Sequence, residues 1–146
     1  MHISFINWLE NRKLDNRDTE KTAGIFFTNG KKVLLLQKPN KKWQLPGGHG
    51  KKGETAHETA KRECLEECGS VEGKSLGSIK NDNWTAFFYK VEKLFDCNLS
   101  DEHIDWEWTD LDKIKDINLT KKFKINLEEH LKFLKSLRER FRWNLL

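Results

Sequence analysis

The segment from Gly47 to Gly69 constrains the fold of this chain more than any other stretch. A glycine-rich turn leads into a run without Gly or Pro, which predicts a helix over residues 55–68. Thr55 is suited to the start of this helix, and Gly69 can end it in a left-handed conformation. The segment therefore predicts one well-bounded helix directly after a tight turn.

Acidic side chains gather along one edge of the predicted helix. A helix advances by about 100° per residue, so Glu63 and Glu67 project within about 40° of each other, with Glu66 close by. Like charges at this spacing destabilise an isolated helix, so their surroundings must offset the repulsion. One interpretation is a solvated face on which Lys61 and Arg62 balance the charge. The other is a hard divalent cation, because Mg²⁺ prefers carboxylate oxygens and is commonly shared with substrate phosphates.

Length and composition fit one folded domain. The chain has 146 residues, and its 36% hydrophobic and 34% charged content is ordinary for a globular protein with a charged surface. A net charge of +4 favours anionic partners but falls short of a basic nucleic-acid-binding tail. The sequence shows no membrane-length apolar run and no signal-peptide pattern, and its three cysteines do not suit a disulfide scaffold. We therefore expect a cytoplasmic protein without a membrane partner.

The other patterns predict a mixed α/β sandwich. Residues 3–13 have helical spacing and residues 15–21 resemble a polar linker, so we assign residues 1–20 to an N-terminal helical extension and residues 21–146 to a single domain. The dipeptide Asn29-Gly30 between two apolar runs predicts a β-hairpin. Further elements are expected as strands at 43–46, 84–91, 94–99 and 106–109, a helical turn at 111–114 and an amphipathic helix at 127–141.

The acidic edge is part of a longer motif. It follows the spacing G-x5-E-x7-R-E-x2-E-E-x-G, whose fixed members are Gly48, Glu54, Arg62, Glu63, Glu66, Glu67 and Gly69. This spacing at residues 48–70 resembles the Nudix box, and the chain resembles the Nudix hydrolase family from about residue 22 to its end. Chance agreement at these positions is on the order of once in 10^8 starting points, which decides against the solvated-face interpretation. The resemblance implies an α/β/α sandwich built around a mixed β-sheet. Cys64 and Ser70 occupy positions where the family usually has aliphatic residues. These two departures affect how the helix packs and not the carboxylates.

The resemblance also implies an activity and a metal site. Nudix hydrolases cleave a nucleoside diphosphate linked to another moiety, using water and usually Mg²⁺ or Mn²⁺. By motif position, Glu63, Glu66 and Glu67 resemble the metal ligands of the family, and the carbonyl oxygen of Gly47 is expected as a further ligand. Bound metal would neutralise the diphosphate oxygens and activate water, which is the chemistry that this cleavage needs.

Two further roles follow from motif position. Arg62 resembles the arginine that orients a box glutamate by charge-assisted hydrogen bonds, and Glu54 resembles the first box glutamate, whose role is partly structural. The general base is either a box glutamate or a loop acid, and sequence does not choose between them. The loop candidates are Glu102, Asp105 and Glu107, of which Asp105 aligns best with the family's acid; a solvated loop carboxylate is the alternative.

Charge and aromaticity predict the residues that bind substrate. Lys38 and Lys51 lie near the motif and would attract phosphates. Aromatic rings can stack on a base, and the candidates are Trp43, Trp84, Phe87 and Tyr89, with Trp43 and Tyr89 preferred. Residues 84–91 alternate in two sets, and periodicity leaves open which set faces the core. A lone tyrosine in this region resembles dinucleoside polyphosphate hydrolases, while the proline typical of ADP-ribose hydrolases is absent.

The preferred function is a metal-dependent pyrophosphohydrolase acting on a small nucleotide derivative. The substrate classes considered are an NTP or dNTP, a dinucleoside polyphosphate, ADP-ribose, FAD and a nucleotide sugar. One alternative is an RNA 5′-pyrophosphohydrolase or decapping enzyme, the less favoured case of a nucleic-acid substrate. Another is a non-catalytic Nudix-fold nucleotide-binding regulator, which is less favoured because every box carboxylate is present.

Overall fold

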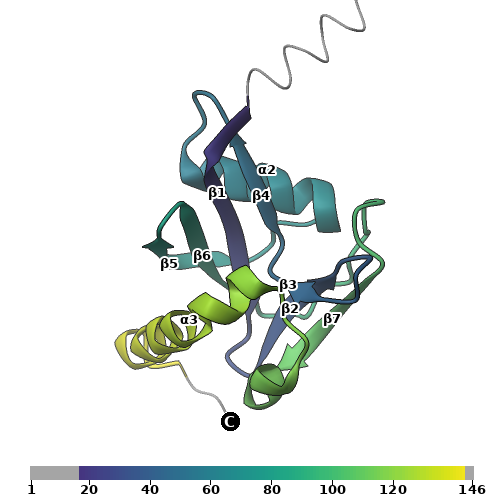
Figure 1. Cartoon of the computed structure of the whole chain (residues 1–146). Coiled ribbons are helices and arrows are strands. Elements are labelled where there is room, and N and C mark those ends of the chain that lie inside the picture. The colour runs from purple at the N-terminus through teal and green to yellow at the C-terminus, as the bar shows by residue number, and fades with distance from the viewer. Residues whose placement is uncertain (1–16, 144–146) are drawn as a thin grey trace, which may run out of the picture.

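The computed structural model describes the backbone of residues 17–143 and the side chains of residues 21–143. Its strands are β1 (Arg17–Thr28), β2 (Lys32–Gln37), β3 (Trp43–Gln44), β4 (Gly47–Lys51), β5 (Lys74–Asn81), β6 (Trp84–Lys90) and β7 (Asp105–Asp110). Its helices are α2 (Ala56–Cys68), the short 3-10 helix η1 (Leu111–Asp116) and α3 (Lys121–Arg140). The strands form one mixed sheet in the order β3-β2-β1-β6-β5, with β4 pairing with β1 and β7 with β2 (Figure 1). Only β1 and β6 are parallel within the described sheet.

Both faces of this sheet are covered by helix. Successive side chains of a strand point to opposite faces. Ile25 and Phe27 of β1 accordingly pack in the core beneath α2, whereas Phe26 packs in the core beneath α3. The α/β/α sandwich with a mixed sheet is therefore confirmed.

The same alternation answers the question left open for β6. Ala86 and Phe88 lie in the α3-side core, while Tyr89 lies in the α2-side core with Phe87 packed against it. Both sets are core residues because a helix covers each face. Periodicity alone does not distinguish them for this reason.

The turn at Asn29-Gly30 is present, but the predicted hairpin is barely paired. Gly30 has a φ of 94°, and the Asn29 side chain accepts hydrogen bonds from the backbone N–H groups of Lys31 and Lys32. The two strands share one residue pair, Thr28 with Val33. The rest of that edge of β1 is taken by β4, which leaves β2 to pair with β7 instead.

Two expectations for connecting segments are wrong. Residues 17–21 belong to β1 rather than to a linker, since backbone pairing with β4 does not require apolar side chains. Residues 94–99 form no strand. The N–H of Asn98 in this segment donates a hydrogen bond to the Cys68 carbonyl oxygen at the end of α2 (3.0 Å) and not to a strand of the sheet. The helix expected at 3–13 lies outside the described residues, and the domain boundary at residue 20 stays a prediction.

The C-terminal helix α3 starts at Lys121 rather than at residue 127. Its buried side includes the predicted Leu127, Leu134 and Leu137, together with His130. Phe141 is 46% exposed and lies at the end of the helix, so it is not part of the buried side. Within the described part of the chain, neither long helix is apolar enough to span a membrane.

Candidate active site

The helix that carries the acidic edge has defined ends. Thr55 accepts a hydrogen bond from the N–H of Glu58, and the Glu58 side chain accepts one from the N–H of Thr55, which forms a capping box. Gly69 ends α2 with a φ of 73°. The boundaries predicted from the sequence are therefore confirmed, and they fix the rotation of the acidic edge about the helix axis.

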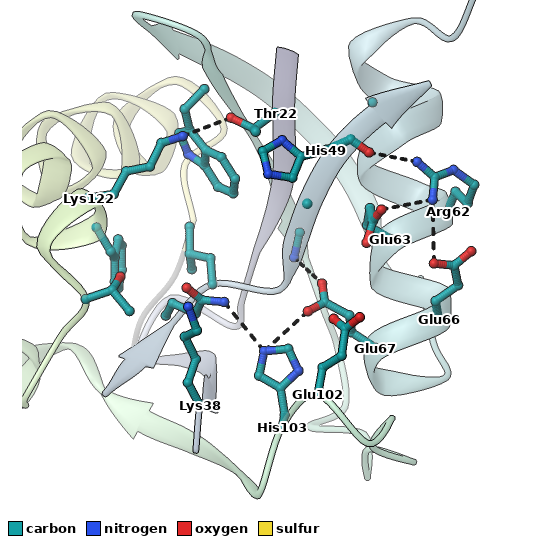
Figure 2. A pocket seen from close by; sticks show the side chains of 18 of the residues that line it. Thr22, Lys38, His49, Arg62, Glu63, Glu66, Glu67, Glu102, His103 and Lys122 are labelled. Atoms are coloured by element: carbon teal, nitrogen blue, oxygen red, sulfur yellow. Dashed lines mark hydrogen bonds and ion pairs between the residues drawn. The ribbon is translucent and has the colours of Figure 1, made fainter. Parts of the chain in front are cut away.

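The acidic edge faces a cavity of about 580 Å³. Figure 2 shows the carboxylates of Glu63, Glu66 and Glu67 on the α2 side of the cavity, with Thr22 and Lys122 on the opposite side. This volume is in the range of pockets that hold a nucleotide-sized organic ligand. The cavity thus has an acidic end and a second end formed by the sheet and α3.

Glu67 is the most deeply buried carboxylate of the site. Its side chain is 4% exposed, and its Oε1 accepts a hydrogen bond from the Gly47 N–H at 2.6 Å. Burial raises the pKa of Glu67 to about 9. Burial also raises the pKa of Glu63, against the opposing effect of the nearby Arg62 guanidinium. The buried Glu67 is therefore the carboxylate most suited to exchange its proton for a cation.

Arg62 holds the outer part of the acidic edge in place. Its guanidinium donates to Glu54 Oε2 at 2.7 Å, to Glu63 Oε1 at 2.9 Å and to the His49 carbonyl oxygen at 2.9 Å. A weaker ion pair joins it to Glu66 at 3.5 Å. The hydrogen bond from Arg62 lowers the pKa of Glu54 to about 2. Arg62 therefore ties α2 to Glu54 in the preceding loop and to the His49 carbonyl oxygen of β4.

The glycines of β4 let the strand pass close to the carboxylates. A Cβ atom at Gly48 would lie 2.5 Å from Glu63 Oε2, and a Cβ atom at Gly47 would lie 2.9 Å from the Trp84 ring. Only glycine leaves room for this approach. These glycines, expected from the sequence to form a turn, lie in strand β4 and set the depth of the cavity.

A family model for the NUDIX domain matches residues 18–132 of the chain. The chain belongs to the NUDIX domain family. Among solved structures, an Ap4A hydrolase from C. elegans in a binary complex is similar at 26% identity and a TM-score of 0.61, covering 80% of this chain and 98% of that one. The MutT protein from Methanosarcina mazei Go1 is similar at 25% identity and a TM-score of 0.56, covering 84% and 98%.

A third similar structure is the Nudix hydrolase RenU from M. smegmatis, with a TM-score of 0.66 at 15% identity, covering 81% and 87% of the two chains. At this identity the likeness concerns the fold. A comparison with curated proteins finds no match. The family model and the similar solved structures together confirm the assignment to the Nudix hydrolases.

The donor set of this Nudix domain fits a hard divalent cation. Glu63, Glu66 and Glu67 offer carboxylate oxygens at one wall of the cavity, beside the backbone of Gly47. Among the described side chains, no lysine or arginine pairs with Glu67, whose Oε2 lies 3.3 Å from Nε2 of the buried His103. Buried carboxylates without a cationic partner are typical of metal sites, because a cation offsets the cost of burying the charge.

The structure brings some predicted substrate-binding residues to the cavity and leaves others outside it. Lys38 and Lys51 line the cavity. Tyr89 is 4% exposed and contacts His57 with its hydroxyl group in the α2-side core. Trp43 packs against the α3-side core, and neither aromatic residue lines the cavity. The alternation of residues 84–91 predicted that Tyr89 lies in a strand but not which layer covers it.

Asp105, the preferred loop acid, does not line the cavity either. It opens β7 opposite Gln37 of β2, and its carboxylate accepts a hydrogen bond from the N–H of Trp106. The loop before β7 instead presents Glu102 and His103 to the cavity. Glu102 was among the loop candidates, whereas His103 was missed, although the adjacent Glu-His pair was a usable signal.

The second end of the cavity was largely missed. Lys122 of α3 donates to the Thr22 hydroxyl oxygen at 3.0 Å and lies 5.3 Å from the centre of the Trp84 ring. Asn126 and His130 of the same helix also line this end. Nothing in the sequence distinguished Lys122 from the many other lysines, because only the packing of α3 against the sheet places it here. Trp84 had been one of the less favoured aromatic candidates.

Proposed function

We propose that this Nudix hydrolase uses Mg²⁺ or Mn²⁺ to cleave a phosphoric anhydride bond in a nucleoside diphosphate linked to another moiety. The observation that carries the proposal is the buried Glu67, which lies beside Glu63 and Glu66 at the wall of a nucleotide-sized cavity. Among the described side chains Glu67 has no lysine or arginine partner, and a bound cation would offset the cost of burying its charge.

The residues of the chain have distinct roles in this proposal. Glu63, Glu66 and Glu67 hold the cation, with the backbone of Gly47 as a further ligand. A bound cation would neutralise the charge of the diphosphate and would make a water bound to it more acidic. Arg62 keeps the Glu63 carboxylate turned toward the cavity through its 2.9 Å hydrogen bond.

The proton acceptor for the attacking water is a box glutamate rather than Asp105 in this proposal. Asp105 lies outside the cavity, whereas Glu66 lines it and its side chain is 57% exposed. A base must come within hydrogen-bond reach of the water it deprotonates. The placement of Asp105 at the start of β7 does not meet this requirement.

The second end of the cavity suits the nucleoside part of the substrate. Trp84 offers an aromatic surface, and its ring is seated against the backbone of Gly24 and Gly47, which fixes its orientation. Lys38 and Lys51 add positive charge near the acidic end, where phosphates would lie. The similarity to an Ap4A hydrolase places a dinucleoside polyphosphate first among the substrates to assay, ahead of NTPs or dNTPs, ADP-ribose, FAD and nucleotide sugars.

The central test replaces the carboxylates without changing their shape. We expect Glu66→Gln and Glu67→Gln to lower kcat/KM on the best substrate by on the order of 100-fold or more, because each loses a metal-binding charge. Circular dichroism should show an unchanged fold. Glu128→Gln is the matched control, since Glu128 is an exposed glutamate on α3 away from the cavity. Turnover like that of the wild type in both site variants would remove the assignment.

The cation requirement has its own test. Activity should disappear on addition of a chelator and return when Mg²⁺ or Mn²⁺ is added in excess, because the carboxylates alone do not neutralise a diphosphate. Hydrolysis that continues in excess chelator would contradict the proposal. Nucleotide binding without turnover at any metal concentration would support the non-catalytic regulator instead.

A further inference from the structure

The side chain of His103 lies against Glu67, one of the carboxylates proposed to bind the cation. The proposed roles of Glu63, Glu66, Glu67 and Arg62 do not involve this imidazole. His103 is 3% exposed, and its Nε2 lies 3.3 Å from Glu67 Oε2. The carboxylate of the neighbouring Glu102 lies close to both side chains. One possible ligand atom from each of Glu67, Glu102 and His103 lies within 4.8 Å of the other two. Figure 2 shows the imidazole and the Glu102 carboxylate beside Glu67 at the cavity.

The hydrogen bonds of His103 are incomplete in either neutral form. Nδ1 is buried without a hydrogen-bond partner among the described residues, and Nε2 faces both the Gln44 side-chain amide nitrogen, at 3.5 Å, and Glu67 Oε2. A proton on Nε2 leaves a bare lone pair on the buried Nδ1. A proton on Nδ1 is itself unpaired, although the Nε2 lone pair can then accept from the Gln44 amide N–H. Burying polar atoms in this state costs free energy, so a purely structural role does not explain the residue.

The loop that carries His103 is fixed to the box helix through the backbone. Ser100 N–H donates to the Glu67 carbonyl oxygen at 3.1 Å, and Ile104 N–H donates to the Gln37 carbonyl oxygen at 2.9 Å. His103 N–H donates to the Ser100 carbonyl oxygen at 3.3 Å. The backbone at His103 is therefore anchored and its imidazole is buried at 3% exposure, which are the conditions for a preorganised metal ligand.

We propose that His103 is a nitrogen ligand of the cation, acting together with Glu67 and Glu102. This inference rests on the proposed function, because it adds a ligand to that site. Mg²⁺ prefers oxygen ligands in an octahedral arrangement, whereas Mn²⁺ and its first-row neighbours accept imidazole as well as carboxylate. A mixed set of carboxylate and imidazole ligands therefore favours Mn²⁺ over Mg²⁺ at this position.

The decisive measurement detects the metal–nitrogen bond directly. The full-length protein is loaded with Mn²⁺ alone, and electron spin-echo modulation is recorded for the ¹⁴N coupling of a bound imidazole. We expect the coupling in the wild type and its loss in His103→Gln. His49→Gln is the matched control, because His49 is an exposed histidine that also lines the cavity. Wild-type protein without the coupling, or coupling that persists in His103→Gln, would overturn the inference.

A binding comparison separates this inference from the proposed function. Calorimetric titration should show that His103→Gln weakens Mn²⁺ binding by about 10-fold or more and Mg²⁺ binding by less. His103→Asn and circular dichroism guard against an effect of misfolding. Equal losses for both cations would sink the nitrogen-ligand inference while leaving the cation site intact. Failure of the wild type to bind either cation would instead count against the proposed function.

Discussion

Glu54 and Glu67 carry the same carboxyl group, yet their surroundings move their pKa values in opposite directions. Glu54 accepts two hydrogen bonds from the Arg62 guanidinium, at 2.7 and 3.0 Å, which favours its charged form. Glu67 is buried away from lysine and arginine among the described side chains, which favours its neutral form. One carboxylate therefore stabilises the apo fold as an anion, and the other is available to a cation.

The Glu54 ion pair should appear in the pH dependence of stability. The pKa of Glu54 is about 2 in the folded state and 4.5 in the reference state, so its contribution is present above pH 4.5 and is lost as the pH falls toward 2. We expect Glu54→Gln to lower the free energy of unfolding by about 2 kcal/mol at pH 7 and to have a smaller effect at pH 2. Urea denaturation across this range measures it, with exposed Glu72→Gln as the control. An equal loss at both pH values would contradict the assignment.

Cation binding should release a proton from the site. Glu67 has a folded-state pKa of about 9, so the apo protein holds this proton at neutral pH and becomes less stable as the pH rises from 4.5 to 9. A cation requires the anionic carboxylate, so its binding displaces the proton. Titration calorimetry at pH 7 in buffers of different ionisation enthalpy should report release of up to about one proton, and less in Glu67→Gln. Binding heats that are independent of the buffer would argue against a protonated Glu67.

At the scale of the element, the ends of α2 matter as much as its acidic edge. The capping box fixes where the first turn begins, and Gly69 ends the helix with a left-handed residue at a φ of 73°. Between these ends, Cys64 and Cys68 face the core while Glu63 and Glu66 face the cavity. A helix that began one residue later would still be amphipathic, but its first turn would lose its capping partner.

We expect Thr55→Ala to lower the free energy of unfolding by about 1 kcal/mol, because the N–H of Glu58 loses its acceptor. Thr55→Ser should retain most of the stability, since serine offers the same hydroxyl acceptor. Chemical denaturation of the three proteins provides the comparison. The capping explanation fails if alanine and serine behave alike.

At the scale of the whole molecule, the cavity is lined by residues of α2 and α3, which cover opposite faces of one sheet. The acidic end comes from α2, and Lys122 and Asn126 come from α3. The seating of α3 depends on its buried apolar side chains, including Leu134, which is 2% exposed. Packing far from the carboxylates therefore shapes the end of the cavity proposed for the nucleoside.

Loosening α3 should affect both stability and substrate binding. Leu134→Ala removes buried volume and should lower the free energy of unfolding by about 2–5 kcal/mol. Because α3 is then packed less tightly against the sheet, KM should increase by a larger factor than the factor by which kcat decreases. Ile125→Ala on the same helix is the control: Ile125 is 68% exposed, so its change should stay within about 0.5 kcal/mol. A pure loss of kcat in Leu134→Ala would show that α3 does not shape the binding end.

Features built from residues close together in the sequence were predicted, whereas features that join distant segments were not. The box helix, its caps and the acidic edge were predicted because a helix converts spacing of three or four residues directly into a shared face. Residues 94–99 were predicted as a strand on local composition, but their hydrogen bonds go to the end of α2. Asp105 was preferred over Glu102 by alignment, although a shift of three positions along the chain moves a side chain from the cavity to the start of a strand.

The sequence by itself determined the family, the acidic helix and the carboxylates proposed to bind a cation, since all of these depend on one continuous segment of glycine-rich strand and helix. Only the tertiary structure decided that His103, Trp84 and Lys122 lie at the same cavity as that helix, and that Tyr89 and Trp43 do not. The physical reason is that contacts between distant segments depend on how helices pack on the two faces of a sheet. Alternation along a strand assigns each side chain to a face, but it does not say what covers that face.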